Sequence, residues 1–205
     1  MFDVNSLPPE LHFALSNAVP KRKAEFAAGR QAAKNALSQL GETACGVGRD
    51  AVGAPVWPPG ITGSISHTEG FCAAVAARTG RLASIGLDCE QLGERLPTEI
   101  LEMIAAPSER RAWLHLDKHL PLNWPIVTFA AKEALYKCLY PSVGRFFDFS
   151  AVVVSIDPEA DGRHGSLRFV DAEDAVIADC DCSEIRGCFR IAGDLVLVGV
   201  EALRE

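Results

Sequence analysis

Hydrophobic residues in the first well-patterned segment of the chain recur at the spacing of an α-helix. Phe26, Ala33 and Leu37 follow this spacing within an Ala-rich stretch, residues 19–40, and alanine has the highest helix propensity. Gly41 comes next, and glycine commonly ends a helix. The pattern therefore predicts one helix that ends at Gly41.

Beyond this helix the pattern favours loops and strands. Residues 41–63 are rich in glycine and proline, which predicts loops and short extended pieces. Apolar runs follow at residues 71–77 and 82–87. Because the Arg-Thr-Gly-Arg sequence at 78–81 resembles a hairpin turn, the two runs are expected to be consecutive strands of a hairpin.

After Glu90 the pattern is first helical and then strand-like. Three helices are expected at residues 97–105, 108–120 and 125–140. Ser108 is the expected N-cap of the second of them. Four strands are expected in the last third, at residues 151–156, 166–170, 187–191 and 194–201.

This order of helix, strands, helices and strands predicts an α+β protein of two lobes. The lobes are expected to join near residues 86–96, which gives an N-terminal lobe of residues 1–85 and a C-terminal lobe of residues 86–205. The sequence contains no simple repeat, so any similarity between the lobes would be one of shape.

Composition narrows the classes of function. The chain has 205 residues, 48% of them hydrophobic, so it can bury a core without disulfides or a structural metal. A net charge of −7 argues against a general nucleic-acid binder. Residues 1–5 do not begin a secretory signal, and no apolar run reaches the roughly 20 residues of a membrane span, so a soluble cytoplasmic protein is expected. Seven irregularly spaced cysteines predict reduced thiols.

Two carboxylates follow the apolar run at 82–87. Asp88 and Glu90 are spaced i, i+2, so in an extended chain their side chains point to the same side. Two like charges held together repel unless a cation or proton intervenes, and Mg²⁺ favours carboxylate oxygens. The pair is therefore a candidate Mg²⁺ site, and the alternative is a solvated strand end.

A third carboxylate lies in the predicted helix at 125–140. Glu133 and Lys137 are spaced i, i+4 and share one face. Phe129 and Leu135 indicate that much of this helix is buried, and an acid and a lysine on a partly buried helix suit a phosphate and metal site. The alternative is a surface ion pair, which contributes little energy.

Hydroxyl and basic residues form a second group of candidates. Ser66 and His67 lie in a Gly-Ser-Ile-Ser-His sequence, whose hydroxyl and imidazole groups suit phosphate contacts. Arg30 on the first helix and Arg49 shortly after it are potential anion partners. The alternatives are a hydrogen-bonded turn with a structural histidine and an ordinary solvated helix face.

These residues lie in five motifs that together resemble those of a known family. In chain order the motifs are Gly29-Arg30, Pro55-Val56-Trp57-Pro58-Pro59-Gly60, Gly63-Ser64-Ile65-Ser66-His67, Gly86-Leu87-Asp88-Cys89-Glu90 and Lys132-Glu133-Ala134-Leu135-Tyr136-Lys137. The set resembles the 4′-phosphopantetheinyl transferases of the monomeric, two-lobed type, and is closest to the group associated with siderophore synthases. The resemblance spans residues 29–137. One departure is Cys89, where an aliphatic residue is more usual.

The resemblance implies two similar α+β lobes related by a pseudo-two-fold axis, with coenzyme A in the cleft between them. It implies a Mg²⁺ site formed by Asp88, Glu90 and Glu133. It assigns the nucleotide end of coenzyme A, with its 3′-phosphate, to Arg30, Arg49, Ser66 and His67. Lys137 would contact the coenzyme A phosphates, and the Trp57 loop would border the adenine pocket unless it is only a packed loop.

The resemblance also implies the reaction. A serine of an apo acyl, peptidyl or aryl carrier protein attacks the phosphorus that bears pantetheine, and 3′,5′-ADP leaves. Glu133 is the candidate base for the serine proton, directly or through a metal-bound water, and Lys137 adds positive charge at the leaving group. The candidate docking surface for the carrier is the helical region 97–125, with Arg110, Arg111, Trp113 and Leu114; its alternative is a set of solvated arginines.

Two rival functions use parts of the same evidence. A different Mg²⁺ enzyme, such as a phosphatase or nucleotide hydrolase, would use the three carboxylates without needing a coenzyme A pocket. A non-catalytic module that binds coenzyme A or a carrier protein would need the pocket without the carboxylates. Because Asp88, Glu90 and Glu133 are all present, the sequence favours the transferase over this module.

Overall fold

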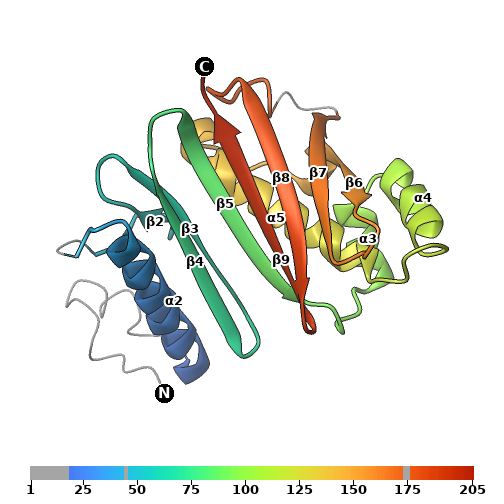
Figure 1. Ribbon diagram of the computed structural model, residues 1–205, viewed down its shortest axis with the longest axis horizontal. Helices are drawn as coiled ribbons and strands as arrows, with labels where there is room; N and C mark the ends of the chain where they lie inside the picture. The colour runs from blue at the N-terminus through green and yellow to red at the C-terminus, as the bar shows by residue number, and fades with distance from the viewer. Residues whose placement is uncertain (1–18, 44–45, 173–175) are drawn as a thin grey trace.

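The computed structural model describes residues 19–43, 46–172 and 176–205. In this part of the chain it shows two lobes, each built from helix and antiparallel sheet (Figure 1). The α+β class predicted from the sequence is therefore confirmed, whereas the pseudo-two-fold relation between the lobes stays a prediction. The prediction that residues 1–5 contain no secretory signal concerns residues outside the described ones.

The N-terminal lobe consists of one helix packed on a β-hairpin. Helix α2 (Pro20–Gln39) lies against the antiparallel pair β3 (Ile61–Thr68) and β4 (Phe71–Arg78) (Figure 1). Two short strands, β1 (Gly48–Arg49) and β2 (Pro55–Val56), form a separate pair in the connection between α2 and β3. The predicted helix at 19–40 is thus confirmed.

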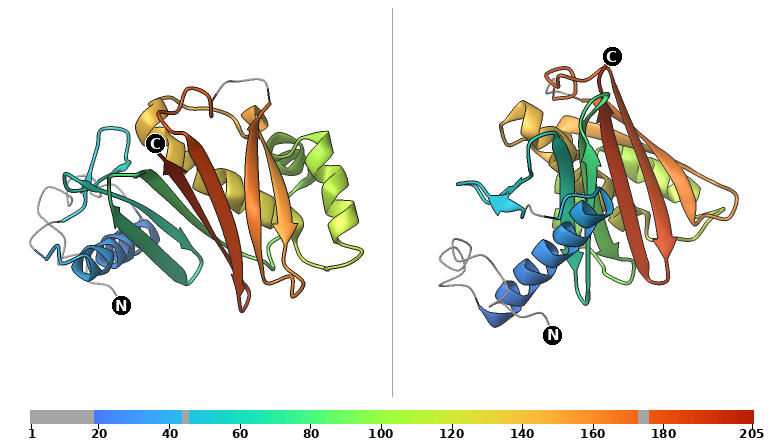
Figure 2. Two further views of the ribbon diagram at one scale, coloured as in Figure 1. Left: turned by 45° about the horizontal axis from the view of Figure 1, so that its top comes forward. Right: turned by 60° about the vertical axis from the view of Figure 1, so that its left-hand side comes forward.

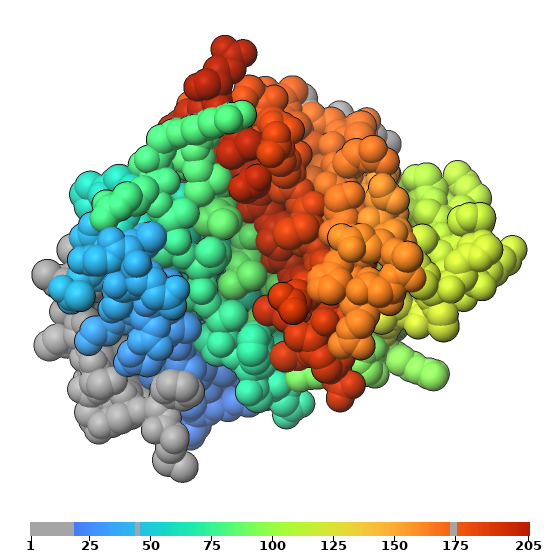
Figure 3. Space-filling model, in the orientation of Figure 1, coloured from blue at the N-terminus to red at the C-terminus, as the bar shows by residue number. Residues whose placement is uncertain are grey.

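The C-terminal lobe is a five-stranded antiparallel sheet in the order β5-β9-β8-β7-β6. Its strands are β5 (Leu82–Gln91), β6 (Val152–Pro158), β7 (His164–Asp171), β8 (Glu184–Ala192) and β9 (Leu195–Leu203). One face is covered by helix α5 (Trp124–Val143) (Figure 2). The 3₁₀ turn η2 (Phe149–Ala151) precedes β6, and the end of the lobe away from α2 carries α3 (Thr98–Ile104) and α4 (Pro107–Leu116) (Figures 1 and 3).

The main hydrophobic core lies between α5 and this sheet. Alternate residues of β9 face the helix and are almost fully buried, namely Val196, Val198, Val200 and Ala202. Gly86 on β5 allows a close approach, because a Cβ at this position would overlap the carbonyl oxygen of Ala134 on α5. The contact fixes α5 against β5, the strand that carries Asp88 and Glu90.

One local prediction about strands is wrong, and one alternative that the sequence left open is excluded. Residues 78–81 do not close a hairpin, because β4 pairs with β3 whereas β5 pairs with β9. The turn therefore connects two different sheets. Residues 63–68, for which a hydrogen-bonded turn was one alternative, belong to strand β3. Small and hydroxyl side chains hide the alternation of this strand, although its Ser64 and Ser66 are buried.

The three predicted helices and four predicted strands of the C-terminal lobe are present, with ends shifted by a few residues. Ser108 is not the N-cap of α4, which begins at Pro107. The backbone N–H of Ala106 instead donates to the Glu109 carboxylate at 2.6 Å. This N–H needs an acceptor because it lies at the helix start, and a side chain in the first turn supplies one.

The predicted boundary between residues 85 and 86 falls inside β5, which pairs with β9 along its length. We propose that the lobes meet instead at the turn of residues 79–81, which joins β4 to β5. None of the helices in the described ranges is both long and apolar enough to cross a membrane.

Candidate functional site

Asp88 is the most deeply buried of the three predicted metal ligands, with only 3% of its surface exposed. Its Oδ1 accepts hydrogen bonds from Ser66 Oγ at 2.7 Å and from Lys137 Nζ at 2.6 Å. Its Oδ2 is buried and accepts no hydrogen bond within the described part of the chain. A buried carboxylate oxygen without a donor is costly, and a bound cation would remove that cost. The residue therefore fits an oxygen-ligand site for a divalent cation.

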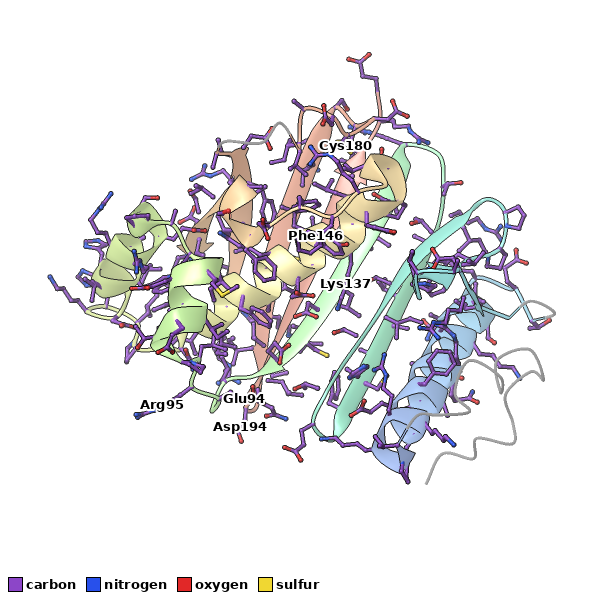
Figure 4. The ribbon with its side chains drawn as sticks, turned by 180° about the vertical axis from the view of Figure 1, so that it is seen from behind. Glu94, Arg95, Lys137, Phe146, Cys180 and Asp194 are labelled. Carbon is purple, nitrogen blue, oxygen red and sulfur yellow. The ribbon has the colours of Figure 1, made fainter. Side chains whose placement is uncertain are left out.

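Lys137 connects three structural elements at this site. Its Nζ donates to Asp88, to Ser66 Oγ at 3.1 Å and to the Leu87 carbonyl at 3.3 Å, so all three ammonium protons have acceptors. Figure 4 shows Lys137 on the side of α5 that faces the β3–β4 hairpin. Its salt-bridge partner is Asp88 rather than Glu133, so the simple surface pair considered from the sequence is not formed.

Glu90 and Glu133 both have perturbed pKa values. Burial raises the pKa of Glu90 to about 7, and repulsion from Asp88 and Glu94 adds to the rise. Burial also raises the pKa of Glu133, while attraction to Lys137 lowers it and repulsion from Asp88 raises it further. Asp88 repels both groups, so Glu133 lies near Asp88 although the two residues are more than forty positions apart in the sequence.

The oxygens of the three carboxylates do not all lie within 4.8 Å of one another, so they do not form a closed cage. In residues 19–43, 46–172 and 176–205, one group of three acid, histidine or cysteine side chains has its ligand atoms within 4.8 Å of one another, and it is Glu159, Asp161 and His164. That group is mostly exposed on the β6–β7 hairpin, away from the five motifs. The donor chemistry at Asp88 fits Mg²⁺, and the ammonium of Lys137 supplies positive charge beside it.

The predicted nucleotide-binding residues other than Ser66, which contacts Asp88, fall into two groups beside α2. Arg30 donates to the Gly48 carbonyl at 2.9 Å, and burial, with repulsion from Arg49, lowers the pKa of Arg30 to about 10. His67 lies instead beside Arg22, with 2.9 Å between Nε2 and Nη1. Arg22 and Arg30 are eight residues apart, which is about 12 Å along a helix. The structure therefore places Arg30 with Arg49, and His67 with Arg22.

The pair of Arg30 and Arg49 has the character of an anion site. Neither guanidinium forms a salt bridge with a carboxylate among the described residues. The buried Nε of Arg30 also has no acceptor there. Two neighbouring cations without an acid attract a phosphate, and the buried N–H would gain an acceptor.

A pocket of about 560 Å³ opens between the lobes beside Lys137. Its walls come from the loop at 52–57, from β3 and from the second half of α5, where Tyr136 and Tyr140 line it. The volume lies in the usual range of small-molecule sites. Trp57 both lines the pocket and packs on the N-terminal core, and its buried indole N–H has no acceptor in the described chain.

The proposed docking surface on α4 needs one correction. Trp113 is buried, and its indole N–H donates to Thr128 Oγ1 at 2.9 Å, so it belongs to the core and is not available to a partner. Arg111 and Leu114 are exposed, and Arg110 is half-buried near Glu102. The exposed part of this surface stays a hypothesis.

Comparison with known proteins identifies the family. Residues 10–77 match the family described as the 4′-phosphopantetheinyl transferase N-terminal domain, and residues 84–178 match the 4′-phosphopantetheinyl transferase superfamily. The chain belongs to this superfamily. The transferase is 30% identical to the 4′-phosphopantetheinyl transferase PptT of Mycobacterium tuberculosis, an alignment that covers 94% of this chain and 84% of PptT.

Two further relatives place the transferase among related enzymes. It is 39% identical to the 4′-phosphopantetheinyl transferase Svp of Streptomyces mobaraensis over 77% of this chain, and the aligned part is 64% of Svp. It is 34% identical to enterobactin synthase component D of Salmonella typhi, over 82% of this chain and 68% of that protein. The predicted family, and its relation to the siderophore-synthase group, are therefore confirmed. Enzymes of this family transfer phosphopantetheine from coenzyme A to apo carrier proteins, as the sequence predicted.

Sequence reasoning missed several residues at or near the site. Arg22 was overlooked because it lies outside the motifs, and its contact with His67 depends on the packing of α2 against β3. Lys132 of the Lys-Glu-Ala-Leu-Tyr-Lys motif received no role, yet it forms a fully buried ion pair with Glu109. Thr68 was not considered, although a hydroxyl at every second residue from Ser64 was a visible signal.

Proposed function

We propose that the inter-lobe site of this chain transfers 4′-phosphopantetheine from coenzyme A to a serine of an apo carrier protein, with Mg²⁺ held by Asp88, Glu90 and Glu133. The observation that carries the proposal is the buried Oδ2 of Asp88, which has no hydrogen-bond donor and lies in the same network as Lys137 at the pocket between the lobes. A phosphatase or a binding module would not account for the family membership.

Each residue near the pocket has a distinct task. The bound cation would neutralise charge on the diphosphate of coenzyme A. Lys137, on the pocket wall, adds a second positive charge for the departing 3′,5′-ADP. We assign Glu133 to accept the proton of the carrier serine, directly or through water, because it shares one face of α5 with Lys137.

The nucleotide end of coenzyme A is assigned to Arg30, Arg49 and His67, as proposed from the sequence. Ser66 was assigned there as well, but it hydrogen-bonds to Asp88 and Lys137, so we assign it to the carboxylates instead. We add Arg22, which contacts His67. Burial lowers the pKa of His67, which favours a neutral ring that accepts a hydrogen bond from the Arg22 guanidinium. Together, His67 and Arg22 are assigned to the 3′-phosphate, and Arg30 with Arg49 offers a second anion site.

Replacing His67 by alanine tests the assignment of the 3′-phosphate. The variant should weaken binding of coenzyme A by about tenfold, since a hydrogen bond to a charged group contributes about 1.5 kcal/mol, but should leave binding of 3′-dephospho-coenzyme A nearly unchanged. Isothermal titration calorimetry with both ligands measures the difference. Equal losses for the two ligands would exclude this contact.

Binding of Mg²⁺ should depend on pH through Glu90. The pKa of the Glu90 carboxyl is about 4.5 in the unfolded chain and about 7 in the folded one, so without metal the folded state is destabilised as pH rises between these values. The cation binds the ionised carboxylate, so Mg²⁺ should raise the melting temperature more at pH 8 than at pH 6. Scanning calorimetry of the protein with and without Mg²⁺ tests this, and equal shifts at both pH values would contradict it.

The partner is an apo carrier protein, acyl, peptidyl or aryl. Such carriers are commonly acidic near their serine, and this chain has a net charge of −7, so docking requires a local basic or apolar surface, such as the exposed arginines and Leu114 of α4. A monomeric state and a cytoplasmic location are part of the same proposal.

The proposed function is tested by incubating the protein with coenzyme A, Mg²⁺ and a panel of apo carriers. We expect at least one carrier to gain the mass of phosphopantetheine, and 3′,5′-ADP to form only when that carrier is present. Release of the nucleotide without any carrier would support the hydrolase, and tight coenzyme A binding without turnover would support the binding module.

A further inference from the structure

Strand β3 presents hydroxyl groups at every second residue toward strand β5 of the other lobe. Ser66 Oγ donates to Asp88 Oδ1 at 2.7 Å, and Thr68 Oγ1 donates to Glu90 Oε2 at 3.4 Å. Residues two apart in a strand point to the same side, so the spacing of the hydroxyls matches the spacing of the carboxylates. Each of these two acids of β5 is thus contacted by one hydroxyl of β3.

The contact at Asp88 shows what such a hydroxyl does. Its Oδ1 is held by Ser66 and Lys137, whereas Oδ2 accepts no hydrogen bond in the described chain. The hydroxyl is neutral, so it orients the carboxylate without competing with a cation for its charge. An ionised carboxylate only accepts hydrogen bonds, so the hydroxyl proton must point at it.

We propose that Thr68 is a positioning residue for Glu90, as Ser66 is for Asp88. Thr68 holds Oε2 of Glu90 and restricts the rotation of a side chain that would otherwise be free to turn away from the metal. Glu90 has more torsions than Asp88 and lies nearer the end of its strand, so it has more freedom to lose. The inference rests on the proposed Mg²⁺ site, and it assigns a residue of the N-terminal lobe to the ordering of ligands in the C-terminal lobe.

The geometry makes the hydroxyl, rather than the methyl group of Thr68, the relevant feature. Thr68 is half-buried at the last position of β3, where it pairs with Phe71. The backbone carbonyl of the next residue, Glu69, accepts a hydrogen bond from the side-chain amide of Gln91 on β5 at 3.0 Å. This second cross-lobe bond keeps the two strand ends together without the hydroxyl. Loss of the hydroxyl alone should therefore leave the fold intact.

Two variants separate the hydroxyl from the packing of the side chain. Thr68→Val keeps the shape and removes the hydroxyl, whereas Thr68→Ser keeps the hydroxyl and removes the methyl group. Mn²⁺, which is visible by electron paramagnetic resonance, replaces Mg²⁺ as the probe. Loss of groups that orient metal ligands typically weakens metal binding by about 10- to 100-fold, and the 3.4 Å distance places Thr68 at the low end.

We expect Thr68→Val to bind Mn²⁺ about tenfold more weakly than the wild type, and Thr68→Ser to bind it as the wild type does. The concentration of Mg²⁺ needed for half-maximal transfer should rise in parallel, while the KM for coenzyme A should not change. If Thr68→Val fails to fold, Thr68→Ala is measured against Thr68→Ser in the same way.

Unchanged Mn²⁺ affinity in Thr68→Val would overturn the inference. If the melting temperature of that variant fell at the same time, the contact would be purely structural. Equal weakening in Thr68→Val and Thr68→Ser would overturn it as well, because it assigns the effect to packing. Mn²⁺ affinity is measured without a carrier, so failure of the transfer reaction would count against the proposed function and not against Thr68.

Discussion

Replacing Glu133 by glutamine is expected to abolish the transfer of phosphopantetheine while leaving the protein folded. Glutamine has nearly the same shape, but it neither accepts a proton nor carries the negative charge that a divalent cation requires. Loss of a general base alone typically slows a reaction by about 10²- to 10⁴-fold, and loss of a metal ligand adds to this. Mass spectrometry of a carrier incubated with the variant measures the effect.

The matched control is Glu184→Gln, an exposed glutamate on β8 that pairs with Arg186 and lies outside the pocket. It makes the same chemical change away from the site and should keep wild-type turnover. Circular dichroism should show that both variants are folded. Turnover near the wild-type rate in Glu133→Gln would remove this residue from the chemistry.

Replacing Lys132 by methionine is expected to lower the free energy of unfolding by about 3–5 kcal/mol, the usual cost of breaking a buried ion pair. The side chains of Lys132 and Glu109 are 2% and 1% exposed, and 2.9 Å separates Nζ from Oε2. Lys132 also donates to the Phe149 carbonyl at 2.8 Å, and Glu109 accepts the Val154 N–H at 2.8 Å. Without the lysine, the Glu109 carboxylate is left buried with no cation. Urea denaturation measures the loss.

A double variant distinguishes this charge effect from a loss of packing. Lys132→Met combined with Glu109→Gln leaves no unpaired charge, and the amide oxygen still accepts one backbone N–H. We expect the double variant to be more stable than Lys132→Met alone. If the loss of unfolding free energy in the double variant equals the sum of the losses in the two single variants, the destabilisation does not come from the unpaired carboxylate.

The sequence allowed prediction of those parts of the fold that depend on local pattern. Helices and strands of the C-terminal lobe were predicted because their apolar periods are regular and their ends carry turn residues. The pairing of β4 with β3 was not predicted, because Arg78 to Arg81 has the composition of a hairpin turn whichever strands it joins. Strand pairing is decided by contacts between distant residues, which a local pattern does not contain.

The candidate site was predicted residue by residue, but its connections were not. Asp88 and Glu133 were recognised from their motifs, whereas the bond between Lys137 and Asp88 requires that α5 pack on β5 at Gly86. The burial of Trp113 was missed for the same reason, since its helix gave no indication of Thr128 on another element. Motifs thus identified the chemical groups, and packing determined which groups meet.

The central claim is that Asp88, Glu90 and Glu133 hold one divalent cation between the lobes. It is tested most directly by counting Mn²⁺ bound to the wild type, to Asp88→Asn and to His164→Gln, which alters the exposed group on the β6–β7 hairpin. One tightly bound ion per chain in the wild type and in His164→Gln, and none in Asp88→Asn, is the predicted result. Retention of the ion in Asp88→Asn, or its loss in His164→Gln, would contradict the claim.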